Sequence, residues 1–243
     1  NSSPVLTNVS VSGNVAATQG GGIYNLSSSS PVLSNVTISG NSANYGGGGM
    51  SNYGSSPVLS NVTVSGNAAT GSGGGIYNNA SSSLSLRNSI VWGNTAASGR
   101  GIYNDTSTSA IAYSIVEGST GSLGSWSLSG CTNDGGNPAD PGTGTANSPF
   151  ADWKDPAISI PPQTGGDYRL AAGTNGDVAA NAGDNSLYPP SAWAAWDTWV
   201  TTLTGSNPVP QTVFETYIAP ALAKDLDGTA RQNGAIDMGA YER

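Results

Sequence analysis

The residues of this chain that could bind a metal ion lie near its C-terminal end. Asp225 and Asp227 stand two positions apart and are followed by a glycine, as at the start of a calcium-binding loop. The glutamate that closes such a loop twelve positions on is missing, and Asp237 lies next to that position. Asp225, Asp227 and Asp237 are therefore candidate Ca²⁺ ligands. The alternative, which we prefer, is a structural contact in which Arg231 pairs with Asp225 or Asp237.

Three tryptophans form a second candidate site. Trp193, Trp196 and Trp199 are three residues apart in a segment where Ser191 can cap a helix. Aromatic rings at this spacing could stack on sugar rings, which predicts a platform for glycans. The alternative, which we prefer, is a short helix whose aromatic side chains cover the open end of the remaining fold or contact a partner.

Catalytic groups are scarce in the rest of the chain. The sequence contains no histidine, its first acidic residue is Asp105, and residues 1–104 carry formal charge only at Arg87 and Arg100. Glycoside hydrolysis commonly needs two carboxylates, and Ca²⁺-dependent lyases need carboxylates and a base. Serine is abundant, but no neighbouring base would activate it. We therefore expect no catalytic residues and no enzyme, with a polysaccharide lyase or hydrolase as the least favoured alternative.

The N-terminal half of the chain consists of a repeated sequence, which forms the scaffold for these candidate residues. Residues 4–14 recur almost unchanged as residues 31–41 and 57–67, and residues 84–94 are a diverged copy. A glycine-rich phrase ending in Ile/Met-Tyr/Ser-Asn follows each copy on the same period. Repeats of this kind indicate a solenoid, in which each unit buries its apolar face against its neighbours.

Each repeat is typical of three short strands separated by corners. β-Branched residues alternate with Ser or Thr, as in residues 9–12, and Gly, Asn and Ser-Pro clusters interrupt the alternation. A loop of about 27 residues at roughly 3.3 Å per residue measures about 90 Å, which suits one coil of a parallel β-helix. We expect about five coils over residues 1–118 and a C-terminal cap domain over residues 119–243.

Equivalent residues of successive coils should stack about 4.8 Å apart. We expect three apolar columns inside the coils: Leu6-Leu33-Leu59-Leu86, Val11-Ile38-Val64-Val91 and Ile23-Met50-Ile76-Ile102. We also expect two asparagine ladders at the corners: Asn8-Asn35-Asn61-Asn88 and Asn14-Asn41-Asn67-Asn94. Stacked asparagine amides can hydrogen-bond along the axis, and asparagine tolerates the left-handed backbone of a sharp corner.

Gly-Gly-Gly-Ile followed by Val/Ile-Ser-Gly-Asn resembles the Gly-Gly-Ala-Ile and Phe-x-x-Asn repeats of polymorphic outer-membrane proteins and related bacterial surface β-helices. The C-terminal part resembles the choice-of-anchor Q domain of such secreted proteins. The matching segments are residues 88–94, 114–118, 166–170, 182–185, 225–231 and 237–242, whereas residues 186–224 depart from the pattern. The resemblance implies an all-β fold, a right-handed single-stranded parallel β-helix with an irregular cap containing short helices, on an exported protein that usually has no assigned activity.

Composition restricts the location and the partners. Charged residues make up 9% of the chain, the formal net charge is −8, and the seven Lys and Arg are scattered singly, which excludes a basic nucleic-acid surface. No apolar run approaches the roughly 18 residues of a membrane span. The chain contains no recognisable signal peptide. We expect an extracellular or cell-surface protein with no nucleic-acid partner and no membrane span.

The first coil suggests how such a protein assembles. Because the chain enters the solenoid in full repeat register, the first coil would present open strand edges and an apolar cross-section to water. We expect self-association through Val5, Leu6, Val9, Val11 and Ile23, with the cap of the next molecule on the other side, although further coils upstream would also cover this surface. A head-to-tail contact of this kind propagates as a filament.

The sequence therefore favours a non-enzymatic structural or surface protein that forms a filament or stalk. Its expected partners are other copies of itself or other surface proteins. The alternative is an adhesin that binds glycans through the cap tryptophans Trp193, Trp196 and Trp199.

Overall fold

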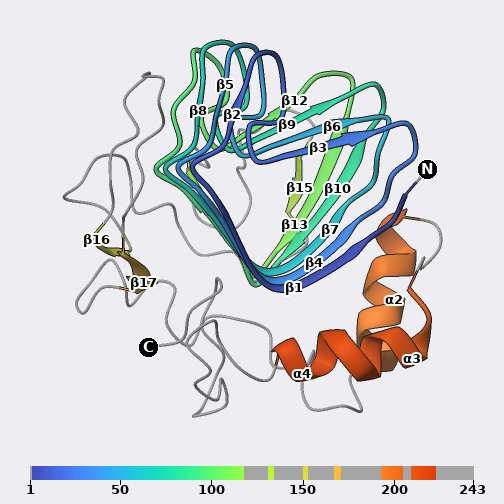
Figure 1. The fold of residues 1–243 in the computed structure, drawn as a ribbon. Helices are drawn as coiled ribbons and strands as arrows, with labels where there is room; N and C mark the ends of the chain where they lie inside the picture. Colours follow the sequence, from blue (N-terminus) through green and yellow to red (C-terminus); the bar gives the residue numbers. More distant parts are fainter. Residues whose placement is uncertain are drawn as a thin grey trace.

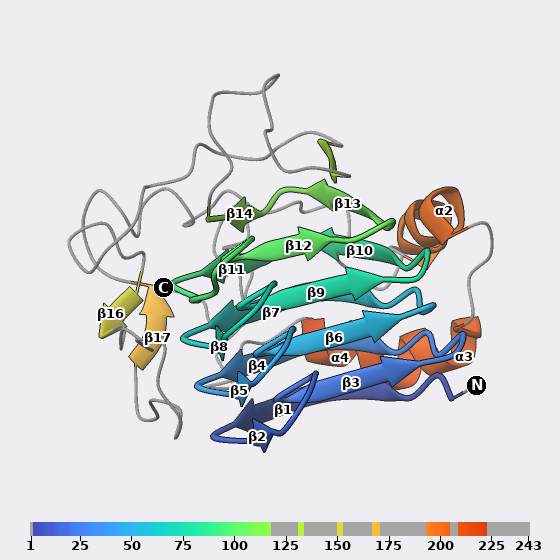
Figure 2. The same ribbon diagram turned by 90° about the horizontal axis from the view of Figure 1, so that it is seen from above.

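The computed structural model describes residues 2–117, 131–133, 150–152, 167–170, 193–204 and 209–222. Residues 5–116 form a parallel β-solenoid of four complete turns and the start of a fifth, seen along its axis in Figure 1 and from the side in Figure 2. The predicted β-helical architecture is therefore confirmed.

Each of the first three turns contains a long strand, a very short strand and a strand of four residues, whereas in the fourth turn an isolated bridge at Thr95 takes the place of the very short strand. The long strands are β1 (Val5–Ser12), β4 (Val32–Ser39) and β7 (Val58–Ser65), with β10 (Ser83–Arg87) and β11 (Ile90–Trp92) taking this place in the fourth turn. The two-residue strands are β2 (Val15–Ala16), β5 (Ser42–Ala43) and β8 (Ala68–Ala69). The third strands are β3 (Ile23–Leu26), β6 (Met50–Tyr53), β9 (Ile76–Asn79) and β12 (Ile102–Asn104).

The fifth turn begins with β13 (Thr108–Ala112) and β14 (Ile115–Val116). A further strand, β15 (Cys131–Asn133), pairs in parallel with β13. The sheet of long strands therefore extends past residue 118, where we expected the solenoid to end. A separate antiparallel pair consists of β16 (Phe150–Asp152) and β17 (Asp167–Leu170).

Two of the three strands expected in each repeat form one bent strand. Asn8, Asn35 and Asn61 lie in the middle of the long strands with φ angles of 55°, 57° and 54°. The parallel register runs through the residues on either side of these asparagines and omits the asparagines themselves. A single left-handed residue thus turns the strand while the inter-turn hydrogen bonds continue on both sides.

The three apolar columns stack as the sequence predicts. Leu6 pairs with Leu33 and Leu33 with Leu59, and the same one-to-one register holds for the other two columns. Ile111 and Val116 of the fifth turn extend the core. The interior is a single apolar cluster whose members from the second turn to the fourth are almost fully buried.

Short helices lie along the side of the solenoid, beside the long strands (Figures 1 and 2). They are α2 (Trp193–Thr204), α3 (Gln211–Val213), the π-helical turn η4 (Phe214–Ile218) and α4 (Ala219–Leu222). Their apolar side chains pack on the outward-facing Val32 and Val58 in a second core cluster. The expectation that the tryptophan segment covers the open end of the solenoid is therefore wrong: α2 covers a lateral face.

Candidate functional site

The proposed Ca²⁺ ligands cannot be placed. Asp225, Asp227 and Asp237, together with their alternative partner Arg231, lie outside the described residues, so the calcium hypothesis stays a prediction. Among the residues that the structure describes, no group of three or more His, Cys, Asp or Glu side chains could hold a metal ion.

The tryptophan segment forms a packed cluster instead of a platform. Trp196 is fully buried, and its ring centroid lies 5.1 Å from that of Phe214 and 6.0 Å from that of the half-buried Trp193. A ring without exposed surface cannot stack on a sugar, so the platform of three tryptophans is wrong for Trp196. The side chain of Trp199 lies outside the described residues. The apolar face of α2 stabilises the lateral packing of the helices.

The first turn has an incompletely covered apolar edge, which we call the first-turn edge. It consists of the outer strands β1, β2 and β3, each paired on one side only, and the side chains of Leu6, Val9, Val11 and Ile23. These four side chains are half-buried, whereas their counterparts in the second turn are fully buried. Val5, which we expected in the same set, faces outward and packs with the helix cluster. Val5 therefore does not belong to the first-turn edge.

The second asparagine ladder has a fixed direction along the axis. Asn14 donates from both its backbone N and its Nδ2 to Oδ1 of Asn41, each at 3.0 Å. Asn41 makes the same pair of bonds to Asn67, and Asn67 makes it to Asn94. Each turn therefore receives two N–H donors from the turn before it. Oδ1 of Asn14 stands at the start of this series and accepts no hydrogen bond from the described residues.

A third ladder was not anticipated from the sequence. The side-chain amides of Asn25, Asn52, Asn78 and Asn104 form a continuous chain, with Nδ2 of each donating to Oδ1 of the next at 2.7–2.8 Å. The signal was present, because these asparagines end the glycine-rich phrase on the repeat period. Like Asn14, Asn25 presents an Oδ1 atom at the first-turn edge that accepts no hydrogen bond from the described residues.

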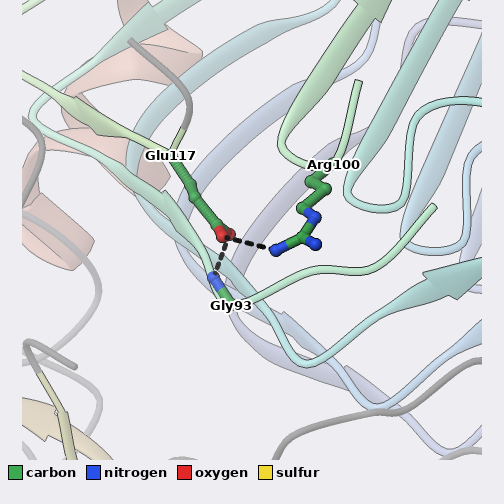
Figure 3. A network of polar contacts seen from close by, with 3 residues as sticks. All are labelled: Gly93, Arg100 and Glu117. Atoms are coloured by element: carbon green, nitrogen blue, oxygen red, sulfur yellow. Dashed lines mark hydrogen bonds and ion pairs between the residues drawn. The ribbon is translucent and has the colours of Figure 1, made fainter. Parts of the chain in front are cut away.

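The buried carboxylate of Glu117, which follows β14 in the fifth turn, contacts two residues of the fourth turn. Glu117 is 3% exposed, accepts a hydrogen bond from the backbone N of Gly93 at 2.8 Å, and lies 3.8 Å from Nη1 of Arg100 (Figure 3). Arg100 occupies the place that Gly21, Gly48 and Gly74 hold in the earlier turns. The carboxylate therefore has a structural role, because it satisfies a backbone donor and pairs with a partly exposed guanidinium.

Tyrosines gather on the outer side of the sheet formed by β3, β6, β9 and β12. Tyr77 lies at their centre, with its ring 6.1 Å from Tyr45 in an edge contact and 5.9 Å from Tyr103 in a stacked contact. Its hydroxyl donates to Oδ2 of Asp105 and accepts from Nδ2 of Asn79, both at 3.2 Å. Burial, followed by the effects of Tyr45 and Asp105, raises the pKa of Tyr77, so this hydroxyl stays protonated.

The tyrosine positions could have been found from the sequence. In the phrase Ile-Tyr-Asn the inward Ile and Asn flank the tyrosine, so the alternation of a strand turns Tyr24, Tyr77 and Tyr103 outward. The contribution of Tyr45 could not be found in this way, because it comes from a loop residue.

The chain matches a known family over more than half of its length. A family model described as a right-handed β-helix region matches residues 1–132, in agreement with the solenoid and with the handedness expected from the sequence. No curated protein and no solved structure matches. No helix in the described part of the chain is long and apolar enough to cross a membrane.

Proposed function

Because this chain belongs to the right-handed β-helix family, we propose that it is a non-enzymatic structural protein of the cell exterior that self-associates head to tail. The first-turn edge supports this proposal best. It combines half-buried apolar side chains with backbone edges that pair on one side only, which natural β-proteins usually cover. A further β-helical turn would bury Leu6, Val9 and Val11 as fully as their counterparts in the second turn.

The polarity of the amide ladders specifies what such a contact must supply. Within the solenoid, Oδ1 of each asparagine in the second ladder accepts N–H groups from the preceding turn. Oδ1 of Asn14 and Oδ1 of Asn25 would therefore accept N–H donors from the surface that lies on the first turn. We infer that this surface is the cap end of a second copy, and that the contact propagates into a filament or stalk.

The proposal that the protein is not an enzyme is supported by the few ionisable groups of the solenoid. Asp105 and Glu117 are the only acidic residues among residues 2–117. Asp105 accepts a hydrogen bond from Tyr77, and Glu117 accepts one from a backbone N–H. Neither carboxylate lies beside a histidine, because the chain contains none, so general acid–base catalysis lacks its usual base.

The extracellular location rests on composition and on resemblance. A solenoid rich in Ser, Thr, Asn and Gly with 9% charged residues is typical of exported β-helices. The likeness of the repeats to polymorphic outer-membrane proteins, and of the C-terminal part to the choice-of-anchor Q domain, supports attachment to a bacterial surface. Other surface proteins are a second class of partner under this proposal.

Assembly can be tested by placing charge on the first-turn edge. We expect the unmodified protein to form elongated particles by electron microscopy and a concentration-dependent series in analytical ultracentrifugation. Val9→Asp with Val11→Asp should abolish both, because two buried carboxylates would have no partner. The matched control is Ser10→Asp with Ser12→Asp, which adds the same charge to the same strand at two exposed side chains that alternate with Val9 and Val11. A protein that stays monomeric at high concentration would contradict self-association.

A further inference from the structure

The outer side of the sheet β3–β6–β9–β12 carries most of the exposed large apolar side chains of the described residues. Tyr24 is 48% exposed, Tyr45 is 56% exposed and Tyr53 is 44% exposed, and Leu26 lies beside them. We call the surface formed by these three tyrosines with Tyr77 and Tyr103 the tyrosine face. Exposed apolar surface that gathers in one place commonly marks a binding site.

The tyrosine face extends along the solenoid axis. Tyr24, Tyr77 and Tyr103 occupy equivalent places in the first, third and fourth turns, and Leu26 pairs with Tyr53 in the neighbouring column. Successive turns are about 4.8 Å apart, close to the length of one hexose unit in an extended glycan. The face therefore offers aromatic groups along the axis over four turns, with Ser51 at the tyrosine position of the second turn, and this direction suits a linear polymer of sugars.

The centre of the face is held in one arrangement. The hydroxyl of Tyr77 is fixed by Asp105 and Asn79, and its ring lies over Gly46, where a Cβ atom would come within 3.0 Å of ring atom Cδ1. Gly46 thus permits the ring to lie flat against the turn. A fixed ring loses little conformational freedom when a ligand binds, which favours affinity.

The polar groups of the face are almost all uncharged. Gln19 and Ser51 are joined by a hydrogen bond of 3.2 Å, and Asn79 lies beside the hydroxyl of Tyr77. Asp105 contributes the one formal charge among these groups, and it already accepts a hydrogen bond. Hydroxyl and amide groups around aromatic rings match the hydroxyl groups and the C–H faces of sugars. Anionic polymers are disfavoured, because the whole chain has a net charge of −8.

We propose that the tyrosine face binds an extended, uncharged polysaccharide chain that runs along the solenoid axis. Tyr24, Tyr45 and Tyr53 supply rings for stacking, and Gln19 and Asn79 supply hydrogen bonds that fix the register of the sugar units. This binding function goes beyond the proposed structural function, because it adds a glycan-binding surface along the side of the filament. It also differs from a platform of cap tryptophans, because the tyrosine face belongs to the sheet β3–β6–β9–β12 and the tryptophans belong to helix α2.

A glycan is preferred over a second copy of the chain on this face. The lateral face of the long strands, where Val32 and Val58 lie, is apolar and covered by helices. The tyrosine face instead carries hydroxyl and amide groups between its rings. A protein partner would have to supply a separate hydrogen-bonding group for each of them. Sugars present hydroxyl groups on every unit and satisfy such groups repeatedly.

The test is isothermal titration calorimetry with three uncharged hexasaccharides, cellohexaose, mannohexaose and chitohexaose, and with hexagalacturonate as the charged comparison. We expect binding of at least one uncharged hexasaccharide and none of hexagalacturonate. Tyr24→Ala with Tyr45→Ala and Tyr53→Ala should raise the dissociation constant by about tenfold or more, since each stacked ring contributes a separate contact. All three side chains are exposed, so circular dichroism should stay unchanged, and the melting temperature should fall only slightly because Tyr45 also makes an edge contact with Tyr77.

The matched control is Tyr217→Ala, which removes a tyrosine that is 59% exposed on the helix η4, away from this sheet. Its affinity should equal that of the unmodified protein. No binding of any uncharged hexasaccharide, or equal affinity of the triple variant and the parent, would overturn the proposal. A triple variant that changes sedimentation but binds no glycan would show a contact between copies instead. Val9→Asp should retain glycan binding, which separates this test from the test of head-to-tail assembly.

Discussion

Asn67 joins three consecutive turns through one side chain. Its Nδ2 donates to Oδ1 of Asn94 in the fourth turn and to the carbonyl oxygen of Ile38 in the second, at 2.9 Å each. Its Oδ1 accepts the backbone N and the Nδ2 of Asn41 at 3.0 Å. The left-handed backbone at this corner belongs to the preceding Gly66, with φ of 67°, so Asn67 is selected for its amide and not for its backbone.

We expect Asn67→Ala to lower the free energy of unfolding by about 3 kcal/mol, because several buried backbone and side-chain groups lose their partners. Asn14→Ala at the solvent-exposed start of the same ladder should cost less than about 1 kcal/mol. Guanidinium unfolding of both variants, followed by circular dichroism, measures the difference. Equal losses at the two positions would show that the ladder does not stabilise the interior more than the edge.

The corner asparagines of the first ladder depend on backbone conformation as well. The same place in the fifth turn is taken by Tyr113, whose φ is 48°, and the guanidinium of Arg87 lies 5.2 Å from its ring centroid. Nδ2 of Asn35 donates to Oδ1 of Asn8, and Asn35 and Asn61 are fully buried, so neither is an acceptor for N-linked glycans.

At the scale of elements, the glycine-rich phrase before each third strand is set by the distance between turns. A Cβ atom on Gly48 would meet the carbonyl oxygen of Ala68 and would lie 2.5 Å from that of Gly74. Both obstacles are backbone atoms, so no side-chain rotation can relieve them. In the fourth turn the equivalent residue is Arg100, whose side chain extends to Glu117 and is 58% exposed.

We therefore expect Gly48→Ala to destabilise the protein by about 2–3 kcal/mol or to prevent folding, since an added atom would push two turns apart. Arg100→Ala, at the same place two turns later, should change the stability by less than about 1 kcal/mol, because it removes only a partly exposed ion pair. Thermal unfolding of the two variants is the measurement. A Gly48→Ala protein with parental stability would contradict the close approach of the turns.

The elements were predictable to the extent that the repeat encodes them. The apolar columns follow from the period of two within strands and of 26 or 27 residues between turns. The two-residue strands such as Ser42–Ala43 were not predictable, because they arise from stacking between turns and have no alternation of their own. The helix at the tryptophan segment was predicted, but its lateral position was missed, although Val32-Leu33 and Val58-Leu59 place apolar residues on both faces, which is the signature of a strand buried on two sides.

The candidate sites were less predictable than the fold. The first-turn edge follows from repeat register, yet the outward position of Val5 depends on which of two adjacent apolar residues enters the core. The burial of Trp196 depends on a cluster that includes Val32 and Val58, more than 130 positions away in the sequence. Spacing within one segment cannot reveal such long-range packing.

At the scale of the whole molecule, a solenoid has no single centre, so the stability of each turn depends on its neighbours. The first turn contacts one neighbouring turn, whereas the third contacts two. The inter-turn hydrogen bonds themselves are alike: the N–H of Ile23 donates to Gly49 at 3.0 Å and that of Ile76 donates to Gly101 at 2.9 Å. Differences in local stability should therefore reflect position and not hydrogen-bond geometry.

Amide hydrogen exchange at two protein concentrations tests this gradient together with assembly. In dilute solution, peptides covering residues 5–26 should exchange faster than peptides covering residues 58–79, because opening the first turn breaks one inter-turn interface instead of two. At high concentration a second copy would cover the first-turn edge, so exchange at residues 5–26 should slow by about tenfold while residues 58–79 stay unchanged. Val9→Asp should remove the concentration dependence and leave the slow exchange of the third turn intact. If residues 5–26 exchange at the same rate at both concentrations, no second copy covers the first turn. If they are as protected as residues 58–79 in dilute solution, the first turn does not depend on a further neighbour for its stability.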